Sequence, residues 1–399
     1  MSIPNIRFEN FSDEYTSTVF SSIASKISKR NKENLITNVI SNSAMYGLIS
    51  QRDFFDKDIA NNDNTENYYI IENGDFVYNP RKSSEAPYGP INLYKYDNAG
   101  VISPLYLCFR TKNVNQLYLE YYFKSPFWYK YIYLYGDSGA RHDRVSIKDE
   151  VFFNMNINLP SFEEQNKVAE FLKLFDKKIE LQSKKIDKLK DLKRELIDKL
   201  VDDVEDYNEF SLKELGTTYS GLSGKSKEDF ENGNCKFINF LSVLKDSINI
   251  DELTYVKVLD NEKQNKVKKG DIFFNTSSET KEEVALCSTI CEEVPNLYLN
   301  SFCFGYRIND FSIINNEYLN ILLHSSSYRK QISNLGQGFT RVNISKNQLL
   351  DLTVKIPNME VQMKIVSTIN TIKTKIDLEE ELLLKLKEMK KGLMQNMFV

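Results

Sequence analysis

The sequence contains few of the residues that build disulfides or catalytic triads. In 399 residues there are 5 cysteines, 1 tryptophan and 2 histidines, His142 and His324. An odd number of cysteines in a long chain does not indicate a disulfide framework, so we expect reduced thiols. Neither histidine lies in a recognisable nucleophile motif, which leaves little support for Ser-His-Asp chemistry.

Long apolar runs and an excess of positive charge are also missing. No stretch approaches the roughly 18 consecutive apolar residues of a membrane span, and residues 1–10 lack the basic-then-apolar plan of a signal peptide. We therefore expect a cytoplasmic protein with no membrane partner. The net charge of −4 excludes a chain coated with basic residues, so any phosphate-binding surface has to be a local patch.

The chain is long enough for more than one domain, and it is a tandem repeat with an offset of about 197 residues. Residues 73–79 (NGDFVYN) match residues 269–275 (KGDIFFN), a Gly-Asp turn followed by a β-prone run. Further on, residues 144–147 (RVSI) match residues 341–344 (RVNI). Each of these leads through a short β-prone run to a proline that opens a helix.

Both copies end in a long helix with a heptad pattern. Apolar residues alternate by four and three positions, and the two helices share one phase. The first helix has Val168, Leu172, Phe175, Ile179, Ile186, Leu189, Leu196 and Leu200, and the second has Ile365, Ile369, Ile372, Ile376, Leu383, Leu386, Leu393 and Met397. Even the polar interruptions recur, at Gln182 and Lys193 and again at Glu379 and Lys390.

The starts of the two helices carry capping residues. Ser161 and Glu164 predict a capping box in the first copy. Asn358 is expected to cap the second helix, with Glu360 in the first turn, where the helix dipole favours a carboxylate.

Connectivity predicts how the helices run. A helix of about 40 residues is on the order of 60 Å long. The first helix ends near Val204 and the next apolar residues begin at Phe210, so no linker can carry the chain back along the helix. The second helix then has to run antiparallel to the first. We expect an α+β protein in which two globular heads are separated by an antiparallel coiled coil, as in a dumbbell with approximate two-fold symmetry.

The predicted boundaries follow from this plan. The two heads are expected at residues 1–157 and 206–355, and the two long helices at residues 158–205 and 356–399.

This order of domains resembles the specificity subunits of type I restriction-modification enzymes. The matching signatures are residues 159–165 (LPSFEEQ) and 356–362 (IPNMEVQ) at the helix starts, with residues 5–11 (NIRFENF) near the beginning of the chain. The resemblance covers essentially the whole chain and rests on the duplicated arrangement, because a Pro-x-x-Glu helix start is common by itself. One departure is Val361, which stands where the first copy has Glu164.

The resemblance implies that each head is a target-recognition domain for one half of a split site in double-stranded DNA. The helices would act as a ruler for the unread spacer, and their outer surfaces would dock two methyltransferase subunits. ATP-driven restriction and motor subunits would join this core. The chain itself would be non-catalytic and hold no cofactor, with S-adenosylmethionine, ATP and Mg²⁺ on the partner subunits.

Contacts with base edges and phosphates need paired donors and acceptors on loops held by a rigid frame. The loops that match between the copies are residues 136–144 with 336–341, and residues 79–84 with 275–281. Residues 220–226 form a further basic loop. We predict that these loops supply the DNA-binding residues Arg81, Lys82, Arg141, His142, Arg144, Lys225, Ser277, Thr280, Lys281, Gln337 and Arg341.

Structural roles remain open for some of these residues. The repeated pair Arg144 and Arg341 could equally bridge a loop to a carboxylate. Lys and Arg number 17 against 18 Asp and Glu in residues 1–157, and 17 against 20 in residues 206–355. Because neither head is basic overall, we expect the subunit alone to bind DNA weakly and the partner subunits to add phosphate contacts.

The motifs of several enzyme classes are absent or incomplete. Residues 219–226 resemble a phosphate loop, but Tyr219 stands where the first glycine belongs. No Asn-Pro-Pro-Tyr or Asp-Pro-Pro-Tyr motif of base methylation is present. The cysteines Cys287, Cys291 and Cys303 lack a fourth zinc ligand at a convincing spacing.

Two alternative functions remain at this point. One is a metal nuclease that uses Asp271, Glu279 and Lys281 to hold Mg²⁺, although the first copy has no Glu-x-Lys after the matching Asp75. The other is a coiled-coil scaffold whose heads bind proteins and which has no DNA specificity.

Overall fold

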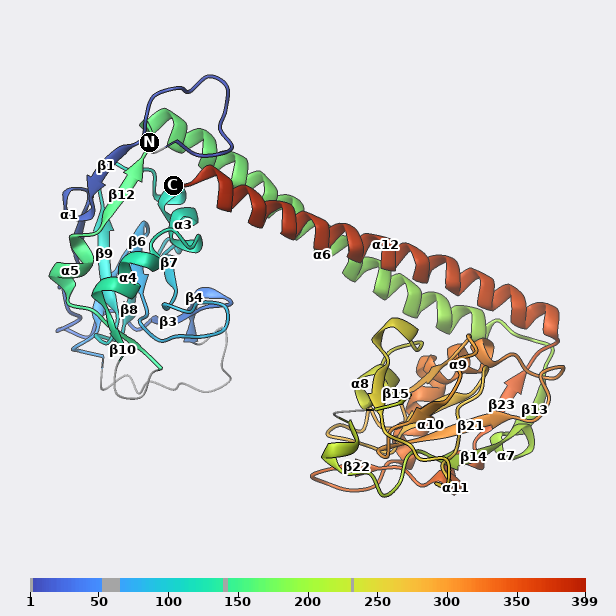
Figure 1. Ribbon diagram of the computed structural model, residues 1–399. Coiled ribbons are helices and arrows are strands. Elements are labelled where there is room, and N and C mark those ends of the chain that lie inside the picture. The colour runs from blue at the N-terminus through green and yellow to red at the C-terminus, as the bar shows by residue number, and fades with distance from the viewer. Residues whose placement is uncertain (1–2, 52–64, 139–142, 231–232) are drawn as a thin grey trace. The chain divides into compact units, whose positions relative to one another are not determined.

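The computed structural model describes residues 3–51, 65–138, 143–230 and 233–399, and the chain divides into two compact units. The first unit contains residues 1–183 and 381–399, and the second contains residues 184–380. Each unit therefore holds one head together with parts of both long helices, as Figure 1 shows by residue colour. Among the described residues, no helix has the length and apolar character needed to cross a membrane.

The first head has two four-stranded sheets, in the orders β2-β9-β6-β7 and β4-β3-β8-β5. Its strands are β1 (Thr16–Val19), β2 (Ala24–Lys26), β3 (Val39–Ser43), β4 (Gly47–Ser50), β5 (Tyr69–Ile71), β6 (Asp75–Tyr78), β7 (Ile91–Leu93), β8 (Gly100–Ile102), β9 (Leu107–Thr111), β10 (Asp137–Ser138), β11 (Val145–Ser146) and β12 (Asn156–Leu159). Its helices are α1 (Phe20–Ile23), α3 (Gln116–Lys124), α4 (Tyr129–Tyr135) and α5 (Asp149–Phe153). The core is aromatic, with Phe76 stacked on Phe109 at 5.2 Å between ring centroids and Trp128 buried nearby.

The second head repeats this arrangement, with a sheet in the order β14-β21-β17-β19 and a three-stranded sheet in the order β16-β15-β20. Its strands are β13 (Asn208–Ser211), β14 (Gly216–Ser220), β15 (Cys235–Ile238), β16 (Thr254–Val256), β17 (Ile272–Asn275), β18 (Ser277–Ser278), β19 (Cys287–Thr289), β20 (Leu297–Leu299), β21 (Cys303–Ile308), β22 (Val342–Asn343) and β23 (Thr353–Ile356). Its helices are α7 (Leu212–Leu215), α8 (Phe240–Val243), α9 (Asn316–His324), α10 (Ser326–Leu335) and α11 (Lys346–Leu350), with 3-10 turns η2 (Lys227–Phe230) and η3 (Ile250–Glu252). The predicted duplication is confirmed.

The two long helices are α6 (Phe162–Asp202) and α12 (Met359–Met397), and they pair antiparallel within each unit. In the first unit Lys390 forms an ion pair with Asp176, and in the second unit Lys185 forms one with Glu379 at 2.6 Å. Every apolar position of the predicted seam is buried or half-buried. The predicted α+β class, with two heads and two antiparallel long helices, is thus confirmed.

A buried glutamine fastens each long helix to its head. In the first unit Gln165 Oε1 accepts a hydrogen bond from the Asn115 backbone N–H at 2.9 Å, while Gln165 Nε2 donates to the Pro160 carbonyl at 3.0 Å. In the second unit Gln362 repeats both bonds, with Asn315 at 2.9 Å and Pro357 at 2.8 Å. The glutamine shared by the two helix-start signatures therefore joins the helix start to the loop before α3 or α9.

The predicted capping box at Ser161 is only half formed. Ser161 Oγ accepts from the Glu164 N–H at 3.3 Å, but the Glu164 carboxylate turns to the N-terminal segment instead of the helix start. It binds the Arg7 guanidinium through both oxygens at 2.8 Å and accepts from the Tyr15 hydroxyl at 3.2 Å. The second copy caps as expected, since Asn358 Oδ1 accepts from the Val361 N–H at 3.0 Å.

We predict that Gln165→Ala lowers the free energy of unfolding by about 3 kcal/mol, because it leaves a buried N–H and a buried carbonyl without partners. Thermal unfolding followed by circular dichroism measures the change. Gln395→Ala, at an exposed position of α12, is the matched control and should change stability by less than about 0.5 kcal/mol. Equal melting temperatures for the two variants would contradict this role of Gln165.

Candidate nucleic-acid interface

The structure brings two of the predicted DNA-binding arginines side by side in the first head. The chain continues past β6 as residues 79–82, which pair with residues 143–145 through hydrogen bonds from Lys82 N–H to Asp143 O and from Val145 N–H to Pro80 O, both at 2.9 Å. In this pairing Arg81 lies opposite Arg144. We call residues 79–82 and 143–146 the first polar edge.

The arginine side chains on this edge are available to a ligand. Arg81 and Arg144 are both exposed, and neither guanidinium forms an ion pair or hydrogen bond with any described residue. They line a hollow of about 290 Å³ together with Asn42, Leu105 and Tyr106. Burial raises the pKa of the Tyr106 hydroxyl, and the charges of Arg144 and Arg81 act in the opposite direction.

Asparagine side chains hold the first polar edge from beneath. Asn79 Oδ1 accepts from the Arg81 N–H at 3.0 Å, and Asn79 Nδ2 donates to the Asn42 carbonyl at 3.0 Å. Asn42 in turn donates to the Val77 carbonyl at 2.8 Å and accepts from Asn92 Nδ2 at 2.7 Å. Because buried amides with several partners have few alternative positions, this network fixes the backbone that carries Arg81.

The second head forms an edge by the same kind of pairing. Ser277 and Ser278 of β18 pair with Asn343 and Val342 of β22, and the Ile344 N–H donates to the Thr276 carbonyl at 3.0 Å. We call residues 275–278 and 341–344 the second polar edge.

The loop next to this edge is closed at its base. Gln337 and Asn343 exchange two backbone hydrogen bonds, at 2.9 and 2.8 Å. Gly338 adopts φ +118°, and a Cβ at this position would meet the Arg341 carbonyl, so the turn requires glycine.

Most predicted residues of the second head lie on or beside the second polar edge. Ser277 is part of it, and Gln337 pairs with its residue Asn343. Thr280, Lys281 and Arg341 are exposed, and the side chains of Lys281 and Arg341 have no ion-pair partner among the described residues.

The two copies differ in register at this point. Arg144 lies opposite Arg81, whereas the residue opposite Ser277 is Asn343, two positions after Arg341. Arg144 and Arg341 therefore match in sequence but do not occupy equivalent positions in the strand pairing of their heads.

Three predicted residues are placed neither on nor beside a polar edge. Arg141 and His142 lie outside the described residues. The Lys225 ammonium forms an ion pair with Glu262 at 2.5 Å, and its side chain is only 6% exposed. Its predicted role in DNA binding stays a prediction, and the ion pair gives this side chain a structural role as well.

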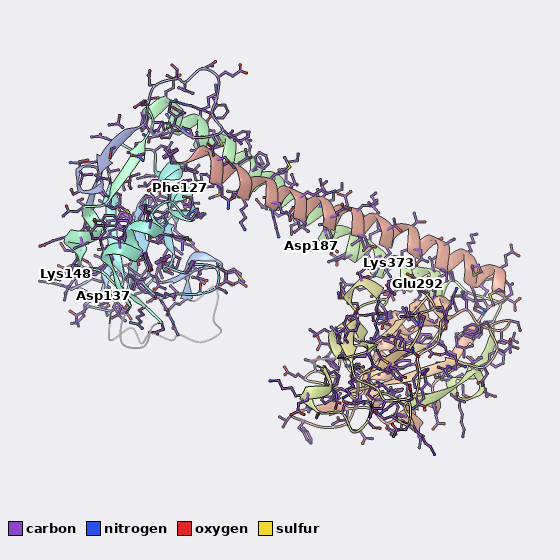
Figure 2. All side chains as sticks on the ribbon, in the orientation of Figure 1. Phe127, Asp137, Lys148, Asp187, Glu292 and Lys373 are labelled. Carbon is purple, nitrogen blue, oxygen red and sulfur yellow. The ribbon has the colours of Figure 1, made fainter. Side chains whose placement is uncertain are left out.

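Both polar edges lie at the end of their head away from its long helices. Figure 1 shows β10 in the first unit and β22 in the second unit far from the helix segments of the same unit. Figure 2 labels Asp137 of β10 at this end of the first head, whereas Phe127 lies nearer the helices.

An ion pair between a buried aspartate and a partly exposed arginine anchors the strand that leads to the polar edge in each head. Asp75, the first residue of β6, binds the Arg110 guanidinium through both oxygens at 2.7 and 2.9 Å. Asp271, before β17, binds Arg307 in the same way at 2.8 and 2.7 Å and also accepts from the Tyr219 hydroxyl at 2.6 Å.

This use of Asp271 bears on the metal hypotheses. Asp271 is 1% exposed and already saturated by its partners, so it is poorly suited to bind Mg²⁺ as the nuclease alternative required. Across the part of the chain that the structure describes, no group of three or more His, Cys, Asp or Glu side chains is placed to hold a metal ion. Cys287, one of the three cysteines considered for zinc, instead contacts His324 at 3.8 Å.

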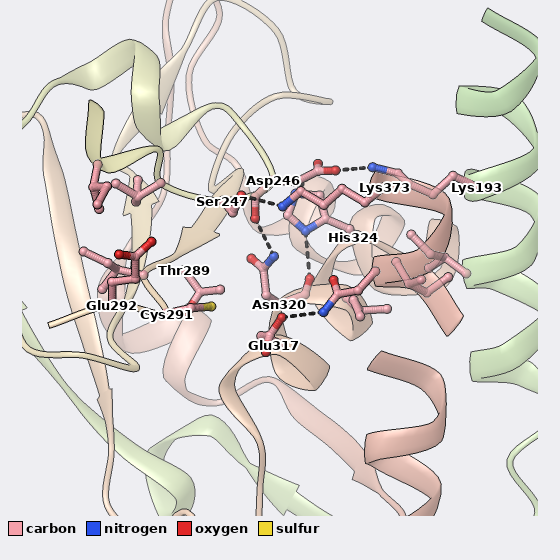
Figure 3. A pocket seen from close by; sticks show the side chains of 17 residues that line it. Lys193, Asp246, Ser247, Thr289, Cys291, Glu292, Glu317, Asn320, His324 and Lys373 are labelled. Atoms are coloured by element: carbon pink, nitrogen blue, oxygen red, sulfur yellow. Dashed lines mark hydrogen bonds and ion pairs between the residues drawn. The ribbon is translucent and has the colours of Figure 1, made fainter. Parts of the chain in front are cut away.

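A second hollow of about 220 Å³ lies between α6, α12 and the head of the second unit, and Figure 3 shows its lining. Lys193 binds Asp246, Lys373 binds Ser247, and His324 Nδ1 lies 2.8 Å from the Asn320 carbonyl. Burial lowers the pKa of His324, which favours the neutral ring. Because Lys193 of α6 and Lys373 of α12 both bind residues of the head, this hollow is a joint between the head and the helices.

Several residues of the polar edges were not predicted from the sequence. Asn42, Leu105 and Tyr106 reach the first edge from β3 and from the turn before β9, and Asn343 reaches the second edge through the register difference. No local pattern marks Asn42. Leu105 aligns with Phe302 when the two copies are superposed in sequence. This recurrence of a large apolar residue could have been noticed from the sequence alone.

Comparisons with known proteins agree with this organisation. The family model described as "Type I restriction modification DNA specificity domain" matches the chain twice, at residues 20–191 and 204–388. A solved structure titled as the type I restriction-modification system S subunit from M. genitalium is 16% identical, with a TM-score of 0.51, and the match covers 100% of this chain and 99% of that chain.

A chain from a structure on complex assembly and conformational transition of the type I R-M system is 14% identical, with a TM-score of 0.62. That match covers 96% of this chain and 97% of that chain. At these identities the likeness shows the fold alone, whereas the two family matches cover most of the chain. The chain therefore belongs to the type I restriction-modification DNA specificity family and carries two copies of its domain.

Proposed function

We propose that each head of this specificity subunit reads one half of a split DNA site and that the long helices set the length of the unread spacer. The observation that carries the proposal is the pair of polar edges. At the same end of each head, two paired segments present polar side chains: the exposed Arg81 and Arg144 on the first edge, and the exposed Asn343 on the second. Two duplicated readers on one chain suit a target with two half-sites.

The two edges offer different chemistry and so should read different sequences. The first edge offers Arg81 and Arg144, and arginine is well suited to guanine O6 and N7 in the major groove. The second edge offers Ser277 and Asn343, and Gln337 lies on the loop beside it. The side-chain amides of Asn343 and Gln337 suit adenine N6 and N7. We therefore expect a site whose halves are unrelated in sequence.

Partner subunits would supply the chemistry. We propose that this chain contributes recognition without catalysis, and that it works in the cytoplasm with two methyltransferase subunits and with restriction and motor subunits. S-adenosylmethionine, ATP and Mg²⁺ would bind to those partners. Support for the methyltransferase contacts comes from the exposed apolar residues on the long helices.

These apolar residues occur at matching positions. Leu181 of α6, in the first unit, is 56% exposed, and Leu378 of α12, in the second unit, is 62% exposed. The sequence offset of about 197 relates these two positions. Leu192, in the second unit, and Met389, in the first, form a second matched pair at 49% and 56% exposure. Exposed apolar residues that recur with the internal repeat favour docking of two copies of one partner.

We predict that exchanging residues 206–355 for the head of another family member changes one half of the methylated site and leaves the other half intact. The measurement is methylation mapping by long-read sequencing in cells that express the chain with its methyltransferase. The unmodified chain should give a split motif. A continuous motif, or no methylation of specific sites, would overturn the proposed function.

We predict that Arg144→Gln lowers the slope of log affinity against log salt by about 0.9, because one cationic contact with a DNA phosphate is lost. Fluorescence anisotropy with a labelled duplex and the methyltransferase complex measures the slope. Lys112→Gln is the matched control, since Lys112 is exposed just after β9, at the end of that strand farther from the first polar edge, and its loss should leave the slope unchanged. The same change in both variants would contradict a specific role for the first polar edge.

We predict that Leu181→Glu and Leu378→Glu each remove one methyltransferase subunit, because a charge placed in an apolar contact weakens it by about tenfold or more. Mass photometry of the purified complex should shift from two bound subunits to one. Asp187→Lys tests another exposed side of α6 and should leave two subunits bound (Figure 2). Full occupancy in both leucine variants would exclude this docking surface.

A further inference from the structure

A tight turn in each head presents one large apolar side chain to solvent. In the first head the turn runs from Ser103 to Tyr106, with the Tyr106 N–H donating to the Ser103 carbonyl at 3.1 Å. In the second head the turn from Asn300 to Cys303 makes the matching bond at 3.4 Å. The third residue of the first turn is Leu105.

The local geometry of the third residue is the same in both turns. The Leu105 N–H points to Ser103 Oγ at 3.4 Å, and the Phe302 N–H donates to Asn300 Oδ1 at 2.9 Å. Leu105 is 66% exposed and Phe302 is 60% exposed. Leaving a leucine or a phenylalanine in water at the same place in two copies is unfavourable, so a ligand that buries this side chain would gain binding energy from it.

Strand register shows that the two positions are equivalent. In the first head Tyr78 pairs with Leu107, the second residue after Leu105. In the second head Phe274 pairs with Phe304, the second residue after Phe302. Tyr78 and Phe274 occupy matching places in the duplicated strands β6 and β17, so the turns before β9 and β21 correspond residue by residue.

Both turns lie next to a polar edge. Leu105 lines the hollow that also contains Arg81 and Arg144. The Phe302 carbonyl accepts from the Thr276 N–H at 3.1 Å and from Thr276 Oγ1 at 2.8 Å, directly before Ser277 of the second polar edge.

From these observations we infer that Leu105 and Phe302 are specificity residues that contact the methyl group of a thymine, one in each half-site. The inference rests on the proposed function and deepens it. The thymine C5-methyl is the one apolar group on a base edge in the major groove, beside the acceptors that arginine and amide side chains read. An apolar side chain beside such donors therefore has a ligand of matching chemistry within the same groove.

The test removes the methyl group from the DNA and the apolar side chain from the protein. Each thymine of the methylated site is replaced in turn by deoxyuridine, which pairs in the same way but has no methyl group. Duplex affinity is measured by fluorescence anisotropy for the methyltransferase complex that carries the unmodified chain, Leu105→Ala or Phe302→Ala. Phe311→Ala, a half-exposed phenylalanine beside Gly270, serves as the control.

We expect one thymine in each half-site whose replacement lowers the affinity of the unmodified complex on the order of fivefold. In Leu105→Ala the effect should vanish for one half-site and persist for the other, and Phe302→Ala should show the reverse. Phe311→Ala should retain both effects.

Three outcomes would overturn the inference. These are the absence of any uracil effect, a uracil effect of equal size in the unmodified chain and the alanine variants, and a loss of affinity in the variants that is the same for every duplex. In each of these cases methylation of a split motif by the unmodified complex would leave the proposed function standing. Absence of a split motif would instead remove both.

Discussion

The structure depends on a buried glutamine that ties each long helix to its head. Gln165 and Gln362 each accept one backbone hydrogen bond from the loop before a head helix and donate one to the carbonyl of the proline that precedes the long helix. Because both partners are backbone groups, the bonds fix the direction of the helix relative to the head whatever side chains the head presents. The proposed function, in which the chain positions a partner enzyme over its site, would need such a fixed joint, since an error of about 1 Å can cost two orders of magnitude in rate.

The two heads share the contacts that hold their strands in place but differ in the side chains on their polar edges. The ion pairs of Asp75 with Arg110 and of Asp271 with Arg307 hold the same strand in both copies, and the four-stranded sheet that contains this strand has the same order in both. The polar edges at the opposite end are both formed by two paired segments, but their register differs and almost none of their side chains are the same. Two arginines face each other on the first edge, whereas a serine faces an asparagine on the second. This division allows one fold to serve different DNA sequences without change to its core.

The sequence predicted the parts of this structure that repeat or that have a period. The heptad seam, the duplicated strands and the Asn358 cap were found because spacing alone marks them. Contacts between distant parts of the chain produce no periodic or repeated pattern in the sequence, so they were not predicted. Glu164 binds Arg7 and does not complete the capping box, and Lys225 binds Glu262. In both cases the fold brings an oppositely charged side chain from a distant part of the chain close enough to form an ion pair. The polar edges were predicted as loops, but their register and the contribution of Asn42 come from sheet pairing that a single sequence does not reveal.

The central claim is that matching edges of the two heads meet opposite halves of one DNA site. The most direct measurement is photocrosslinking from a photoreactive amino acid at position 81 or at position 277, in the methyltransferase complex bound to a duplex with its mapped site. The account predicts crosslinks to one half-site from position 81 and to the other half-site from position 277. Crosslinks from both positions to the same half-site, or to flanking DNA alone, would contradict it.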